Sequence, residues 1–143
     1  MNLIRTPILA IGASLAINPA TALTFPETCI SPPATVTSIT GIDTRHAHME
    51  ARYTLPDIIQ ACHQGYVDQA GAPPNVCIAR HKDLLQAPSL HAYADCVAGT
   101  VKVEDDDEIK LPVYPACANG GIRAVAAFKT LCPSYGGKIE SEE

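Results

Sequence analysis

Two histidines separated by one residue, His46 and His48, form the most suggestive chemical pattern in this sequence. In an extended segment, both imidazoles would project from one face and could bind a copper or zinc ion, with Met49 or Glu50 beside them. In a helix they would point about 200° apart and could not share an ion. Because the local residue types favour a helix from about Thr44, two surface histidines are the ordinary interpretation.

The other three histidines are weaker candidates. His63 follows Cys62 directly, but adjacent residues of a helix do not face each other, so a thiolate with a histidine base is not expected. His81 and His91 fall on separate predicted helices, where solvated side chains are the ordinary outcome. The sequence has no Gly-x-Ser-x-Gly, His-Glu-x-x-His or Cys-x-x-Cys-His motif, so it favours a non-enzymatic role.

An acidic run at residues 104–108 could supply oxygen ligands to calcium, but it lacks the spacing and the glycine of an EF-hand loop. Polar and apolar residues alternate on both sides of it, over 100–104 and 109–113, as in half-buried strands. The run is therefore predicted to be the solvated turn of a small β-hairpin. Pro112 should confine the second strand to a sheet edge.

Residues 1–22 have the pattern of a secretory signal peptide. Arg5 supplies a positive charge, residues 8–17 form a short apolar stretch, and small residues precede a cleavage site near Ala22. The apolar stretch is well short of the roughly 20 residues that cross a membrane as a helix, so no transmembrane segment is expected. The sequence therefore predicts a protein that is secreted or periplasmic after cleavage.

Six cysteines lie beyond the predicted cleavage site, and an even number in a small exported domain predicts three disulfides. They are Cys29, Cys62, Cys77, Cys96, Cys117 and Cys132. The chain has no Trp and only 2 Phe, so its core must consist mainly of aliphatic residues and Tyr. Each disulfide typically adds about 2–4 kcal/mol to the stability of such a domain.

Only one disulfide pairing can be excluded from the sequence. Cys117 and Cys132 lie at the two ends of a predicted helix, about 20 Å apart, which is too far for a bond. Cys77 and Cys96 could bond across a helical hairpin that bends at Pro88. That arrangement would leave Cys29 and Cys62 to pair with Cys117 and Cys132 in either order.

Helical patterns cover much of the remaining sequence. The clearest helix begins with a capping pattern at Thr54 and Asp57, continues with apolar residues three and four apart, and ends at Gly71. The other predicted helices cover residues 75–87 with Asn75 as the cap, residues 89–99 with Ser89 as the cap, and residues 119–132 with Asn119 as the cap.

These elements predict one small, mainly α domain over residues 23–143, stapled by disulfides and carrying a minor β-hairpin. Residues 23–38 are expected to be an extended lead-in, since prolines recur in them. The glycine- and charge-rich tail over 136–143 is expected to be disordered.

The charge of the predicted mature chain limits its partners. Cleavage near Ala22 removes one basic residue, Arg5, and no acidic residue. The mature chain then has 9 basic and 15 acidic residues, a net charge of 9 − 15 = −6 with neutral histidines. A net-negative chain without a basic run is a poor partner for nucleic acid. The sequence therefore favours an exported, non-enzymatic protein that binds a protein or a small ligand. A periplasmic copper- or zinc-binding protein using His46 and His48 is the second hypothesis, and a hydrolase with no identifiable catalytic residue is the third.

Overall fold

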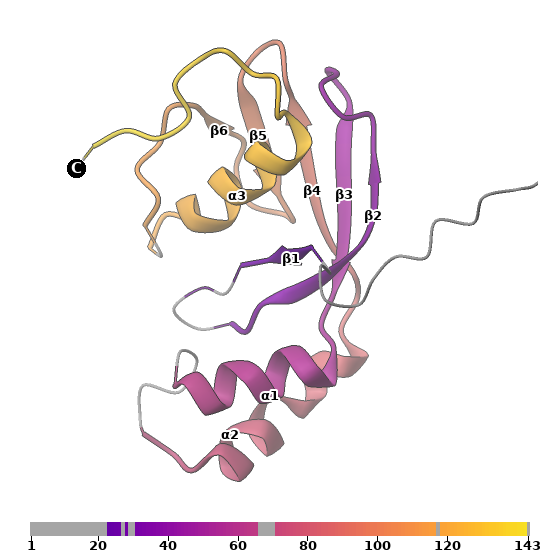
Figure 1. The fold of residues 1–143 in the computed structure, drawn as a ribbon, viewed down its shortest axis with the longest axis vertical. Helices are drawn as coiled ribbons and strands as arrows, with labels where there is room; N and C mark the ends of the chain where they lie inside the picture. The colour runs from indigo at the N-terminus through magenta and orange to yellow at the C-terminus, as the bar shows by residue number, and fades with distance from the viewer. Residues whose placement is uncertain (1–22, 27, 29–30, 66–70, 117, 143) are drawn as a thin grey trace, which may run out of the picture.

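A six-stranded antiparallel sheet dominates the structure, a computed structural model that describes residues 23–26, 28, 31–65, 71–116 and 118–142. The strand order is β1-β2-β3-β4-β5-β6, so each strand lies beside its neighbour in sequence (Figure 1). The strands are β1 (Thr24–Phe25), β2 (Ala34–Thr40), β3 (Ala47–Arg52), β4 (Leu90–Asp95), β5 (Thr100–Val103) and β6 (Ile109–Lys110). The prediction of a mainly α domain with a minor hairpin is therefore wrong.

The helices occupy two separate places around the sheet. They are α1 (Leu55–Gln64), α2 (Pro74–His81), the 3-10 helix η2 (Lys82–Gln86) and α3 (Gly121–Leu131). The curled sheet forms a half-barrel, and α3 packs inside it (Figure 1). The other three helices connect β3 to β4 and lie beyond one end of the sheet.

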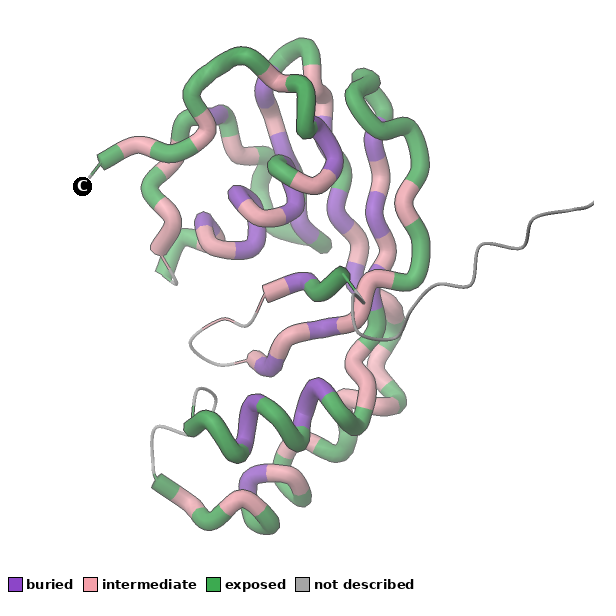
Figure 2. Tube along the Cα trace, viewed as in Figure 1, coloured by how far each residue is buried: buried purple, intermediate pink, exposed green. Residues whose placement is uncertain are grey.

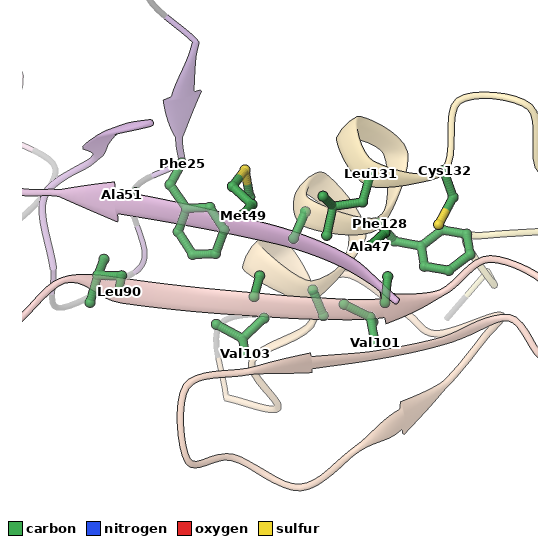
Figure 3. Close-up of a cluster of buried hydrophobic side chains, with 14 of the residues drawn as sticks. Phe25, Ala47, Met49, Ala51, Leu90, Val101, Val103, Phe128, Leu131 and Cys132 are labelled. Atoms are coloured by element: carbon green, nitrogen blue, oxygen red, sulfur yellow. The ribbon is translucent and has the colours of Figure 1, made fainter. Parts of the chain in front are cut away.

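The main core lies between α3 and the inner face of the sheet. Phe128 and Leu131 of α3 are fully buried there, together with Met49 of β3 and Val101 of β5 (Figure 3). Several inward positions of the sheet are alanines, which leave room for the larger side chains of α3. In Figure 2 the buried residues of α3 lie on the side that faces the strands.

Strands β3 and β4 correct two helix predictions. The segment after Thr44 and the segment 89–99 were both expected to be helical, yet each alternates between buried and outward-facing residues along a strand. In β3 the buried residues are Ala47, Met49 and Ala51. Alanine, methionine and glutamate are good helix formers, but the preference amounts to less than about 1 kcal/mol per residue, and burial of every second side chain in a sheet outweighs it.

The remaining predicted elements are closer to the structure. Thr54 and Asp57 form the expected capping box of α1, but that helix ends at Gly65, which adopts the left-handed conformation. Residues 66–70 lie outside the described part of the chain. Pro73 rather than Asn75 caps α2, and Gly120 rather than Asn119 caps α3. The hairpin of β5 and β6 is confirmed.

Two disulfides join described cysteines, and their pairing differs from the expected one. Cys62 bonds to Cys77 with a Cα–Cα distance of 5.7 Å, and Cys96 bonds to Cys132 at 5.4 Å. The expected Cys77–Cys96 bond is wrong, because Cys96 lies on the sheet and Cys77 lies in the α1–α2 pair. Because Cys132 bonds to Cys96, it cannot also bond to Cys117, and that is the pairing that the sequence excluded. Cys29 and Cys117 lie outside the described residues.

The C-terminal segment also departs from its prediction. Val113 donates its N–H to the carbonyl of Ile139, and Ser141 donates to the carbonyl of Val113. These bonds hold residues 139–141 beside residue 113, although disorder was expected from 136 onward. Within the described residues, no helix has the length and apolar character needed to cross a membrane.

Candidate ligand-binding face

None of the described helices lies over the outer face of strands β3, β4 and β5, because α3 packs against the inner face. We call this surface the open face. The strand register places its side chains in two rows. The first row contains Thr40, His48, Tyr93 and Lys102, and the second contains Ser38, Glu50 and His91. The open face therefore gathers aromatic, basic and acidic groups on rigid strands.

Three rings at the centre of the open face lie in contact, and we call them the ring ladder (His48, His91 and Tyr93). His48 Nε2 lies 3.0 Å from His91 Nδ1, so the protonated nitrogen of this pair donates a hydrogen bond to the other. The Tyr93 ring stacks on His48, with 4.6 Å between centroids and 21° between planes. Tyr93 remains 49% exposed, so its ring is accessible to a ligand.

Two hollows flank the ring ladder, and Tyr93 lines both of them. The first hollow has a volume of about 680 Å³ and the second about 470 Å³. The first is lined mainly by Arg45, His46, His48, Tyr93, Asp95, Thr100, Lys102 and Glu108. The second is lined mainly by Tyr53, Leu84, Pro88, Ser89, His91, Tyr93, Glu104 and Asp105.

In the first hollow, the acidic side chains are bound within the chain while the lysine is available. The Asp95 carboxylate accepts hydrogen bonds from the backbone N–H groups of Ala98 and Val97, which lower its pKa. Glu108 accepts a hydrogen bond from Thr100 at 3.2 Å. Among the described residues, Lys102 has no hydrogen-bond or ion-pair partner. Hydrogen bonds from neutral donors do not cancel the charge of a carboxylate, so the first hollow carries charges of both signs, and the Lys102 ammonium is free to contact an anionic group of a ligand.

The carboxylate of Glu50 is also occupied. A side-chain hydrogen bond with Ser89 lowers the pKa of Glu50, and the Ser89 oxygen accepts a hydrogen bond from Arg52 Nε at 2.8 Å. Nearby His91, Arg52 and His48 lower that pKa further. Glu50 therefore stays ionised beside the ring ladder, and it is directed toward Ser89 on the side of the second hollow.

The two histidines that the sequence paired both line the first hollow, but they make different contacts. His48 lies on β3 and contacts His91, whereas His46 lies exposed in the turn before β3, near Asp95. His63 and His81 belong to α1 and α2, away from the open face. In the described part of the chain, no group of three or more His, Cys, Asp or Glu side chains is arranged to hold a metal.

Sequence reasoning missed the partner of His48 and the aromatic and basic residues beside it. His91 and Tyr93 were assigned to a helix, so their common strand face with His48 was not recognised. The feature that could have revealed this face is an alternation with a period of two residues. It runs through β4 as it does through β3, with buried and outward residues in turn. Comparison with known proteins does not add a function, since no family model, similar curated protein or similar solved structure matches this chain.

Proposed function

We propose that this chain is an exported, non-enzymatic binding protein, and that its open face binds a flat organic ligand with an anionic group. The main support is the combination of an exposed tyrosine ring and an unpaired lysine, which face each other across β4 and β5. Tyr93 offers a surface for stacking, and Lys102 offers a positive charge directly beside it. The flanking first hollow provides about 680 Å³ for the ligand.

The export part of the proposal is supported by disulfides. Two of them join described cysteines, and such bonds persist in oxidising compartments. The proposal therefore depends on the open face, and binding is what must be tested.

A fluorescent anion tests the open face directly. Anilinonaphthalene sulfonate (ANS) carries a flat naphthalene ring and an anionic sulfonate, and it becomes fluorescent on protein surfaces that exclude water. We expect the folded chain to bind it at neutral pH, and Lys102→Met to weaken binding about three- to fivefold through loss of one partly exposed charge contact. Fluorescence titration gives both affinities.

The matched control is Lys138→Met, because Lys138 is exposed and lines neither hollow. Its affinity for ANS should equal that of the unmodified chain. Thermal unfolding of each variant must remain cooperative, since partly unfolded proteins also bind ANS. Equal binding by the unmodified chain and by Lys102→Met would contradict the proposed site.

A second candidate function is binding of copper or zinc by His48 together with His91. The 3.0 Å between their nitrogens is close to the roughly 2.9 Å that separates neighbouring ligands at right angles around a metal with bonds of about 2.0–2.1 Å. A metal would replace the shared proton, and the two rings would tilt to face it. Water would complete the coordination, because the described residues offer no third histidine, cysteine or carboxylate ligand there.

A site made by His48 and His91 and a site made by His46 and His48 can be told apart by mutation. If His48 and His91 hold the ion, His91→Ala should lower copper or zinc affinity at least about tenfold, and His46→Ala should leave it nearly unchanged. Calorimetric titration of each variant with copper and zinc measures the difference. The reverse result, with His46 essential and His91 dispensable, would restore the pair that the sequence suggested.

A further inference from the structure

We infer that the ligand of the open face is zwitterionic, with its anionic group beside Lys102 in the first hollow and an organic cation beside Glu104 in the second. This inference rests on the proposed function, because it adds a second subsite to the same face. The cation is a guanidinium or alkylammonium group, as in a short peptide or an amino-acid derivative.

The second hollow is built to receive a cation with an apolar stem. Tyr53 and Tyr93 supply aromatic rings, and Leu84 and Pro88 supply apolar surface. Glu104 and Asp105 add carboxylates at its edge. A cation held by ring faces and a carboxylate is stabilised by both, which is how proteins bind alkylammonium and guanidinium groups.

The backbone of Glu104 is fixed while its carboxylate stays open to a ligand. Its N–H donates to the carbonyl of His91 at 2.7 Å, and its backbone adopts the left-handed conformation with φ 54°. Such a conformation is unfavourable for glutamate and is found where surrounding structure imposes it, often at binding sites. In the described residues, no hydrogen bond or ion pair engages its carboxylate.

The surroundings of Glu104 make its negative charge unfavourable in the free protein. Glu104 is exposed at the surface, but the loss of part of the water around its carboxylate raises its pKa, and the nearby carboxylates of Asp105 and Asp106 raise it further, while Arg123 and His91 act in the opposite direction. A bound cation would relieve this unfavourable charge. Binding of a cation should therefore be stronger here than at a fully hydrated carboxylate.

The spacing of the two charges fits one small molecule. Lys102 and Glu104 are two residues apart along the chain, so their Cα atoms are about 7 Å apart at roughly 3.4 Å per strand residue. They form no ion pair with each other, because each lines a different hollow. Tyr93 lines both hollows and lies between them, so a ligand ring stacked on it could place one charge in each.

Three related probes separate the two subsites in calorimetric titrations with the full oxidised protein. Benzoylarginine carries a ring, a carboxylate and a guanidinium, hippurate lacks the guanidinium, and benzoylargininamide lacks the carboxylate. We expect benzoylarginine to bind about fivefold more tightly than hippurate. Glu104→Gln should reduce benzoylarginine affinity to that of hippurate and leave hippurate binding unchanged.

Asp107→Asn provides the matched control, because Asp107 belongs to the same acidic run but lines neither hollow. It should leave all three affinities within about twofold. If hippurate binds through Lys102 but benzoylarginine binds no better, the zwitterion inference is overturned and the proposed function stands. If neither hippurate nor benzoylarginine responds to Lys102→Met, the proposed function fails and the inference fails with it.

Discussion

Replacing Cys96 and Cys132 together with alanine is expected to lower the free energy of unfolding by about 4 kcal/mol. The bond closes a loop of sequence separation 36, and the entropy that it removes from the unfolded chain grows slowly with loop length. It joins the end of β4 to the end of α3, across the main core. Its loss should therefore lower the melting temperature of the whole domain by about 10–20 °C.

The other described disulfide supplies the matched control. Cys62–Cys77 closes a loop of separation 15, for which chain entropy predicts about 3 kcal/mol. Its two residues belong to a second apolar cluster with Ile58 and Ala61, separate from the main core. Replacing this pair with alanine should loosen α1 and α2 while leaving most of the sheet protected, since separate clusters can open independently.

Urea unfolding with circular dichroism, combined with amide hydrogen exchange, distinguishes the two double variants. The Cys96/Cys132 variant should lose protection throughout β3, β4 and α3, and the Cys62/Cys77 variant mainly in residues 55–86. Unfolding of both variants at the same urea concentration with identical exchange patterns would contradict this division.

Peptide mapping of the oxidised chain should also recover a Cys29–Cys117 peptide, because these two cysteines are the only ones left to form the third predicted bond.

Local signals predicted the elements that depend on local interactions. Thr54 and Asp57 identify the start of α1, and the apolar spacing of α3 is visible without any tertiary information. Strands β3 and β4 each pair with a strand nearby in sequence, but they also pair with each other over more than 35 residues, since Glu50 pairs with His91 across the α1–α2 insertion. Their helix-favouring residues conceal an alternation that only sheet burial explains.

The candidate site was predictable only in part for the same reason. The sequence offers His48 as a candidate only as the partner of His46 and only in an extended segment, which β3 provides for His48 although a helix was favoured there. Its neighbours His91, Tyr93 and Lys102 come from two other strands, so no local motif could contain them. Once β3 and β4 are recognised as paired strands, their outward residues must share one face, because every second side chain of a strand points to the same side of the sheet.

Arg123 is the other residue whose role the sequence did not reveal. It lies on α3 with only 7% of its surface exposed, four residues before buried Ala127. Its guanidinium donates to the carbonyls of Pro26 and Pro32 at 3.2 and 3.1 Å and to the Tyr53 hydroxyl at 3.3 Å. It thus ties the segment around β1 and one wall of the second hollow to α3.

Arg123→Met should lower the free energy of unfolding by about 3–4 kcal/mol, because several oxygen acceptors would lose a charged donor, and an unsatisfied buried group costs about 1–3 kcal/mol. It would also remove the cation that lies 5.3 Å from the centre of the Phe25 ring. Arg123→Lys should have an intermediate effect, since one ammonium cannot reproduce the planar fork of donors. Urea unfolding measures both.

Arg52→Met is the matched control, because the Arg52 side chain is 66% exposed, donates one hydrogen bond to a serine oxygen and lies 3.9 Å from the Glu50 carboxylate in a surface ion pair. Its effect should stay below about 1 kcal/mol. Since Arg123 holds Tyr53, Arg123→Met should also weaken benzoylarginine more than hippurate under conditions where the variant remains folded. An Arg123→Met protein as stable as Arg52→Met would show that water replaces the guanidinium at these carbonyls, and that the tie between α3 and the second hollow is dispensable.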